Sequence, residues 1–163
     1  MTPKDLTIVI QGPLHKHSLA NLERYKRLGK EVLSYWDNFD SSLLSNINLE
    51  GVTKVVTPRN ISASTYNQQN CYYQFLSSLE GLLAVRSPFA MKVRSDHAIE
   101  DISLFIRQFE KAPEKLVCSN LHFRPDKVFK FHCSDKFIMG TTDNLLGTFA
   151  LAEERCRTDA ILL

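Results

Sequence analysis

Short apolar runs alternate with amphipathic segments along this chain, and that alternation restricts its fold more than any other feature. The runs are rich in Val, Ile, Leu and Phe, which is typical of strands that are buried on both faces. Between them, Leu and aromatic residues recur at steps of three and four, which predicts helices. Strands that alternate with helices indicate an α/β fold with a mainly parallel sheet flanked by helices.

The length of 163 residues corresponds to a single domain, which we expect to cover residues 1–163. The predicted strands are Leu6–Ile10, Glu31–Trp36, Val52–Thr57, Phe89–Val93, Leu116–Phe123 and Val128–Phe131. One helix is expected between a cap at Ser18 and a stop at Gly29, and a long one from the Thr65 capping box to Ser87. Further helices are expected around Ile102–Phe109 and from about Asn144 onward.

The charge balance and the missing motifs exclude several classes of function. Lys and Arg number 20 against 18 acidic residues, so the net charge is only +2. A charge this small does not predict binding to nucleic acid. The chain has no GxGxxG segment, no P-loop and no GxSxG elbow. These absences disfavour a dinucleotide dehydrogenase, a P-loop enzyme and an α/β-hydrolase.

The four cysteines form no CxxC pair, the first residues are polar, and no apolar run is long enough to span a membrane. We therefore expect reduced thiols and a cytoplasmic protein without a signal peptide or transmembrane segment. If its substrates are membrane-borne, the protein would reach them peripherally, at the inner face of the membrane.

Polar residues follow several of the predicted strands. In open α/β sheets, ligands bind outside the carboxyl ends of the strands. Four segments occupy such places: Gln11–Leu14, Trp36-Asp37, Pro58–Asn60 and Arg94–His97. Trp36 is the only Trp, and it either stacks on a nucleobase beside Asp37 or packs in the core.

The segment Met91–Asp101 carries most of the chemical information, because a buried strand delivers Arg94 and Asp96 to its exposed end. A carboxylate there can hold Mg²⁺ or Mn²⁺, and an Arg can bind phosphate through two hydrogen bonds. Together they suit a diphosphate leaving group, although the same two residues can equally form an ion pair that closes the strand.

A second acidic residue, Asp135, lies between apolar stretches and close to His132. A carboxylate in such a place can act as general base toward a hydroxyl. The alternative is a turn or helix-cap role, which Asp143 fits better because it directly precedes the last predicted helix.

Five blocks of the sequence resemble, in order, the WavE lipopolysaccharide-synthesis family. They are Thr7–Leu14, Val32–Asp37, Asn70–Leu82, Ala90–Asp96 and Ser134–Leu145. The resemblance implies a GT-A-like, Rossmann-like fold that binds a nucleotide-diphospho-sugar, and a glycosyltransferase activity. It implies a nucleotide-sugar donor and a glycan or glycolipid acceptor, such as lipopolysaccharide core or capsule.

The resemblance carries over to individual residues. Matches to the family pattern are Gln11, Gly12, Pro13, Trp36, Asn70, Gln74, Ser77, Gly81, Leu82, Lys92, Arg94, Asp96, Ser134, Asp135, Gly140 and Asp143. Expected donor-binding residues are Gln11, Gly12, Pro13, Trp36, Asp37, Asn70, Gln74 and Arg94. Arg94 and Asp135 are the expected catalytic residues, and Asp96 is the expected ligand of a divalent cation.

The sequence also departs from the family pattern. Tyr72 and Tyr73 stand where the family often has Asn and Arg, and Arg94 replaces the first carboxylate of the usual Asp-x-Asp. A need for Mn²⁺ or Mg²⁺ is therefore left open, with Arg94 taking part of the charge-neutralising role. The resemblance further implies that part of an acceptor-binding region is absent from the chain.

Two other functions are compatible with the sequence. One is a non-catalytic domain that binds a nucleotide or glycan, which the missing first carboxylate favours. The other is a sugar-phosphate nucleotidyltransferase, which would be expected to carry a glycine-rich basic segment where this chain has Gln11–Leu14.

Overall fold

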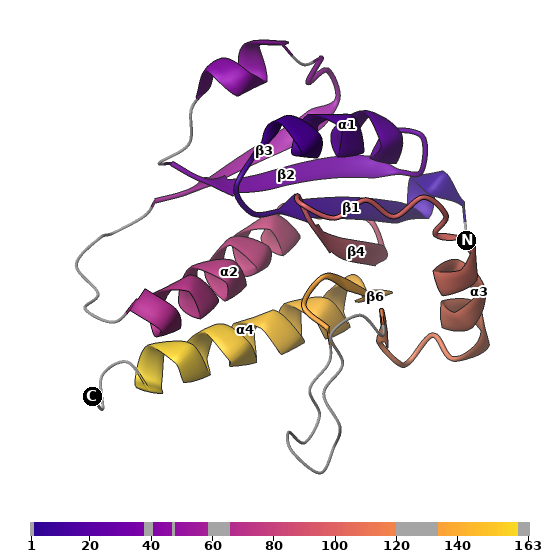
Figure 1. Cartoon of the computed structure of the whole chain (residues 1–163). Coiled ribbons are helices and arrows are strands. Elements are labelled where there is room, and N and C mark those ends of the chain that lie inside the picture. Colours follow the sequence, from indigo (N-terminus) through magenta and orange to yellow (C-terminus); the bar gives the residue numbers. More distant parts are fainter. Residues whose placement is uncertain (1, 38–40, 47, 59–65, 120–133, 160–163) are drawn as a thin grey trace.

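The computed structural model describes residues 2–37, 41–46, 48–58, 66–119 and 134–159. These residues form one six-stranded sheet with helices on both faces (Figure 1). The strands are β1 (Leu6–Gln11), β2 (Lys30–Trp36), β3 (Val52–Thr57), β4 (Phe89–Arg94), β5 (Val117–Cys118) and β6 (Phe137–Thr141). The α-helices are α1 (Lys16–Tyr25), α2 (Tyr66–Leu83), α3 (Ser103–Lys111) and α4 (Thr142–Asp159), and 3-10 turns cover Pro3–Asp5 and Ser41–Asn46.

The sheet is mainly parallel, as the alternation predicts. The strand order is β3-β2-β1-β4-β6-β5, and the first four strands run parallel to one another. Strand β6 alone runs against its neighbours on both sides. Gln11 pairs in register with both Ser34 and Arg94, so β1, β2 and β4 end at the same edge of the sheet.

Alternate residues of the central strands bury opposite faces of the sheet, as strand geometry requires. In β1, Ile8 and Ile10 join a core that also contains Leu22 of α1 and Phe109 of α3. Val9, between them, joins the other core, which α2 and α4 cover. Figure 1 shows α2 and α4 side by side beneath the sheet and α1 on its opposite face.

One glycine sets how closely α2 approaches the sheet. A Cβ on Gly81 would lie 2.6 Å from Val9 Cγ1 and 2.9 Å from the Cβ of Ser34, both closer than real atoms tolerate. Ser34 Oγ donates a hydrogen bond of 2.6 Å to the Ser77 carbonyl, one turn earlier in α2. This contact places the polar residues of α2 next to the end of β1.

Several predicted boundaries differ from the structure. Helix α1 begins at Lys16, so Ser18 lies inside its first turn and accepts the backbone N–H of His15 at 3.0 Å. Asp143 likewise lies in the first turn of α4, where its charge complements the helix dipole. Of the predicted strand Leu116–Phe123, residues 117–118 form β5. Residues 120–123, the predicted strand Val128–Phe131 and the Thr65 cap lie outside the described residues.

Strand β6 is the main element that sequence analysis does not predict. Its five residues are mostly buried, and Gly140 interrupts the apolar run. Val93 pairs with Phe137, so β6 starts beside the end of β4 because the two strands are antiparallel. Asp135, which precedes β6, is thereby brought to the carboxyl-end edge of the parallel strands.

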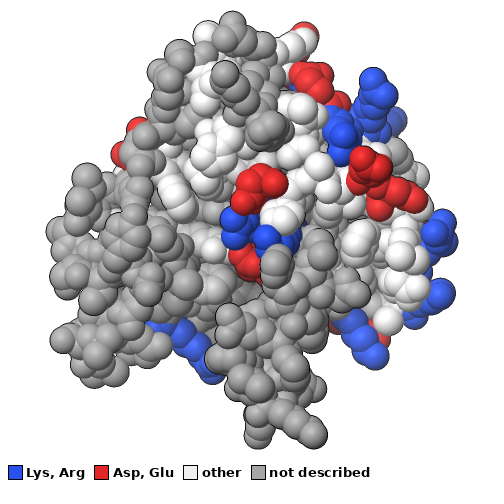
Figure 2. All heavy atoms as spheres, in the orientation of Figure 1, with Lys and Arg blue, Asp and Glu red and all other residues white. Residues whose placement is uncertain are grey.

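The distribution of surface charge agrees with the small net charge of +2. Acidic and basic side chains are intermixed on the described part of the face shown in Figure 2. None of the helices in the described ranges has the length and apolar character that a membrane crossing requires.

Strand β2 buries a carboxyl group, that of Glu31, near its amino end and away from the carboxyl-end edge of the parallel strands. Glu31 is 4% exposed, and neither of its carboxyl oxygens has a hydrogen-bond partner among the described residues. Burial raises its pKa to about 7, with Lys26 opposing the shift and Glu23 adding to it. Because the folded state then holds a proton that the unfolded state releases, stability should fall as pH rises from about 4.5 to about 7.

A Glu31→Gln variant should therefore be more stable than the parent at alkaline pH. The free energy of unfolding should increase by up to about 3 kcal/mol at pH 8, and hardly at all near pH 4, where Glu31 is protonated in both states. Urea unfolding at the two pH values measures the difference. Glu50→Gln, at an exposed position, is the control, and an equal effect of Glu31→Gln at both pH values would contradict the burial argument.

Candidate functional site

A pocket opens at the edge where β1, β2 and β4 end. It has a volume of about 340 Å³ and is lined by Gln11, Gly12, Pro13, Trp36, Gln74 and Arg94. Pockets of this size accommodate small organic ligands. All six lining residues belong to the set that the sequence predicts to bind the donor.

The turn after β1 forms one wall of the pocket. Gly12 has φ +123°, a backbone conformation that favours glycine, and its N–H donates to the Ser34 carbonyl at 3.1 Å. Ser95 Oγ donates to the Pro13 carbonyl at 2.6 Å, and the Ser95 N–H donates to the Gln11 carbonyl at 2.8 Å. Both sides of the Gly12 turn are thus fixed to the end of β4.

Gln11 presents an unsatisfied acceptor in this pocket. Its side chain is 2% exposed, and its Nε2 donates to Ser77 Oγ at 2.9 Å. Its Oε1 has no hydrogen-bond partner among the described residues. An unpaired buried acceptor costs free energy, which a ligand that donated a hydrogen bond to this oxygen would recover.

Trp36 lines the pocket and also packs against α2. Its Nε1 donates to the Tyr73 carbonyl at 3.4 Å, and its ring meets the Tyr73 ring at 62° with the centroids 6.2 Å apart. Asp37 directly follows β2 and is exposed. Its N–H donates to the Thr57 carbonyl at the end of β3 at 3.2 Å. The structure places Asn70 in α2 but does not describe its side chain.

Arg94 lies between two carboxylates. Its Nε and Nη2 donate to the two oxygens of Asp96 at 2.9 and 2.6 Å, and its Nη1 donates to Asp135 Oδ2 at 3.2 Å. The hydrogen bonds to Asp96 are the main reason that the pKa of Arg94 is raised further. Burial acts to raise the pKa of Asp96, but Arg94 outweighs it and the pKa falls below its ordinary value. All three groups are therefore ionised near neutral pH, and we call them the Arg94 cluster.

Asp135 is held by more than Arg94. Gln74 Nε2 also donates to Oδ2, and Lys92 Nζ donates to the Asp135 backbone carbonyl. Burial acts to raise the Asp135 pKa, but the Gln74 hydrogen bond, the Lys92 charge and Arg94 together lower it. Oδ1 has no hydrogen-bond partner among the described residues, and the side chain is 38% exposed, which leaves this oxygen available to a substrate.

The described residues do not fit a divalent cation well. Both oxygens of Asp96, the expected ligand, accept hydrogen bonds from Arg94. In the part of the chain that the structure describes, no group of three or more His, Cys, Asp or Glu residues could hold a metal ion. A cation would have to displace the guanidinium from Asp96.

Three polar residues near the pocket are absent from the expected site. Lys92 is fully buried in β4, with its Nζ 5.8 Å from the Phe149 ring centre. Ser95 fixes the Gly12 turn, and Lys136 pairs through its backbone carbonyl with the Arg94 N–H at 3.1 Å. Lys92 could have been found from the sequence, because a charged residue within an apolar strand is unusual. The positions of Ser95 and Lys136 depend on tertiary structure and have no such local signal.

Comparison with known proteins gives one family. The family model for WavE lipopolysaccharide synthesis matches residues 6–152. No curated protein matches the sequence.

Several solved structures share the fold. 4-diphosphocytidyl-2C-methyl-D-erythritol synthase from Anaerococcus prevotii matches with a TM-score of 0.52 and 13% identity, over 91% of this chain and 75% of the synthase. HddC from Yersinia pseudotuberculosis matches with a TM-score of 0.51 and 12% identity, over 87% of this chain and 79% of HddC. The glycosyltransferase GlyE of Streptococcus pneumoniae matches with a TM-score of 0.52 and 10% identity, over 94% of this chain but 38% of GlyE.

Proposed function

This chain belongs to the WavE lipopolysaccharide synthesis family, and from that premise we propose that it is a GT-A-type glycosyltransferase. The proposed reaction moves a sugar from a nucleoside-diphosphate donor to a hydroxyl of a surface glycan, such as lipopolysaccharide core or capsule. The proposed place of action is the cytoplasm, at the inner face of the membrane.

The observation that carries the proposal is the pocket at the strand ends, which has the Arg94 cluster at one side. Gly12 and Pro13 offer a close approach to the backbone, and Trp36 offers an aromatic surface for a base. Gln11 Oε1 offers an acceptor for a ribose hydroxyl or a base N–H. These are the kinds of groups that a nucleotide needs, and Arg94 supplies a cation where the diphosphate would lie.

In the proposed reaction the bond between the sugar and the diphosphate breaks, and negative charge builds on the diphosphate. Arg94 binds the carboxylates of Asp96 and Asp135, and the Lys92 ammonium binds the backbone carbonyl of Asp135. Two cations thus balance the two carboxylates, and the guanidinium can stabilise the negative charge of the leaving group. A fixed cation of this kind is effective because the protein has already organised it before the reaction begins.

Asp135 is the proposed general base if the reaction inverts the configuration of the sugar. Its Oδ2 is occupied by Gln74 and Arg94, which fixes the direction of Oδ1. Oδ1 would accept the proton of the acceptor hydroxyl as that oxygen attacks the sugar. A retaining reaction would not need this base.

A sugar-phosphate nucleotidyltransferase is the second candidate. It is supported by the likeness to the A. prevotii synthase, which covers 75% of that protein, whereas the likeness to GlyE covers 38% of GlyE. Against it stands the turn at Gln11–Leu14, which has one glycine and no basic residue.

Product analysis separates these candidates. The protein is incubated with UDP-, GDP- and CDP-sugars, with and without Mn²⁺, and released nucleoside diphosphate is measured. We expect slow release from one donor, and an Asp96→Ala variant should lower it about tenfold or more because Arg94 loses its two-point anchor. Asp143→Ala, which removes an exposed carboxylate at the opposite edge of the sheet, should behave as the parent.

Two results would contradict the proposal. Release of pyrophosphate from a nucleoside triphosphate and a sugar 1-phosphate would indicate the nucleotidyltransferase. Binding of a nucleotide without turnover of any donor, in the presence or absence of Mn²⁺, would indicate a non-catalytic domain. Complete dependence on Mn²⁺ would instead revise the role given to Arg94.

A further inference from the structure

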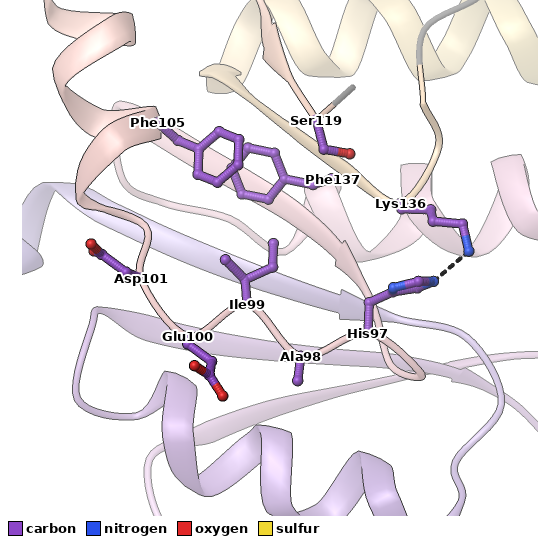
Figure 3. Close-up of a pocket in the computed structure, with 9 residues that line it drawn as sticks. All are labelled: His97, Ala98, Ile99, Glu100, Asp101, Phe105, Ser119, Lys136 and Phe137. Atoms are coloured by element: carbon purple, nitrogen blue, oxygen red, sulfur yellow. Dashed lines mark hydrogen bonds between the residues drawn. The ribbon is translucent and has the colours of Figure 1, made fainter. Parts of the chain in front are cut away.

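A second cavity, of about 250 Å³, adjoins the Arg94 cluster. It lies between the loop that follows β4, the start of α3, the end of β5 and the start of β6 (Figure 3). His97 and Lys136 line it, and each directly follows a carboxylate of the cluster in the chain, Asp96 or Asp135. The His97 N–H donates to the Arg94 carbonyl at 3.1 Å, which fixes this wall of the cavity to the cluster.

One side of the cavity is aromatic. The rings of Phe105 and Phe137 have centroids 4.2 Å apart and planes at 38° to each other. Figure 3 shows the two rings together, with Ile99 across the cavity from them. An aromatic surface of this kind suits the apolar face of a flat or ring-shaped ligand.

Ser119 adds a buried polar group without a partner. It is 7% exposed, and its hydroxyl oxygen has no hydrogen-bond partner among the described residues. Its side chain lies in the cavity wall close to Phe137 (Figure 3), and its N–H donates to the Phe137 carbonyl at 3.3 Å. A hydroxyl kept buried and unpaired costs free energy, which a bound ligand with hydroxyl groups would recover.

His97 and Lys136 supply a second polar point. Lys136 Nζ lies 2.5 Å from His97 Nε2. Burial, and next the Lys136 charge, lower the pKa of His97. The imidazole is therefore neutral near pH 7 and accepts a hydrogen bond from the ammonium, whose remaining protons can bind ligand oxygens.

We propose that this cavity binds a neutral sugar ring of the acceptor glycan, with Phe105 and Phe137 against the ring and Ser119 and Lys136 on its hydroxyls. The inference rests on the proposed transferase function and names where its acceptor binds. His97 and Lys136, which line the cavity, directly follow Asp96 and Asp135 in the chain, so a ring in this place borders the two segments that carry the carboxylates of the Arg94 cluster.

The charge of the cavity favours a neutral ligand over the donor diphosphate. Glu100 and Asp101 also line it, against the single ammonium of Lys136. The two carboxylates disfavour a diphosphate, whereas they can accept hydrogen bonds from sugar hydroxyls. The proposed donor pocket, by contrast, has no carboxylate among its six lining residues.

Binding of simple glycosides to the full chain tests the proposal without any need for turnover. Methyl glycosides of glucose, galactose, mannose and heptose serve as probes, with NMR titration as the measurement. Ser119→Ala and Phe105→Leu should each weaken binding of the preferred glycoside about three- to tenfold, the effect of one lost hydrogen bond or ring contact. Leu104→Ala, at an exposed position of the same helix, should bind as the parent does.

Two further measurements make the result decisive. Ser119→Ala should not lower the melting temperature, because the hydroxyl has no partner among the described residues. Affinity for UDP, GDP and CDP should be unchanged in both variants. The proposal is overturned if no glycoside binds the parent chain, if the variants bind glycosides equally well, or if they lose nucleotide affinity, which would assign the cavity to the donor. Failure of the donor-turnover assay alone would overturn the transferase proposal and leave the glycoside result standing.

Discussion

Replacing Asp135 with asparagine should reduce sugar transfer by about 10²–10⁴-fold, the usual contribution of a general base. Asparagine has nearly the same shape, and its carbonyl oxygen can still accept from Gln74 and Arg94 in the place of Oδ2. What it cannot do is take a proton from the acceptor hydroxyl. Donor binding, measured by calorimetry, should therefore stay nearly unchanged while transfer is lost.

The electrostatics of Asp135 add a prediction about pH. Its pKa lies below the ordinary value of 3.8, so the carboxylate remains ionised through the whole range near neutrality. Transfer should accordingly show no loss between about pH 8 and pH 5 that is due to this group. Asp143→Asn, in the first turn of α4, is the matched control. Loss of donor affinity in Asp135→Asn would show that Asp135 only anchors Arg94 and the donor site.

Replacing Arg94 with alanine should reduce donor turnover by about 10²–10³-fold, the typical effect of removing a fixed charge that stabilises the transition state. The loss has two parts. The guanidinium no longer opposes the charge of the leaving diphosphate, and the carboxylates of Asp96 and Asp135 lose the cation between them. Their pKa values should rise, and the site should become more negative.

An Arg94→Lys variant distinguishes charge from geometry. A lysine keeps the positive charge but not the planar fork that reaches both oxygens of Asp96 and also Asp135. We expect it to recover only a small part of the activity. Arg86→Ala, which removes an exposed arginine at the opposite edge of the sheet, should be as active as the parent. Full activity in Arg94→Lys would show that a point charge suffices.

The local sequence pattern predicts most of the sheet because its signals are local. The runs of β1 to β4 are apolar and end at recognisable stops, such as Pro58 and the turn at Gly12. Strand β6 is different, since it is short, contains Gly140 and leads directly into α4. Its direction depends on pairing with β4, which no local pattern reveals.

Some residues of the candidate site can likewise be predicted from the sequence, and others cannot. Gln11, Trp36 and Arg94 can be found from the rule that ligands bind at strand ends, and the structure places all three in one pocket. The family resemblance adds Gln74, which local reasoning alone would treat as a surface residue of a helix. The contact between Gln74 and Asp135, the buried Oε1 of Gln11 and the second cavity around Ser119 depend on tertiary packing.

The reversed direction of β6 makes the site depend on the pairing of one short strand. Ser119, which follows β5, and Asp135, which precedes β6, both lie at the edge that carries Arg94. A shift of β6 by one residue against β4 would turn the side chains of β6 to the other face of the sheet and carry Asp135 away from Gln74 and Arg94. The register between β4 and β6 is therefore as much a part of the site as the side chains that line its pocket.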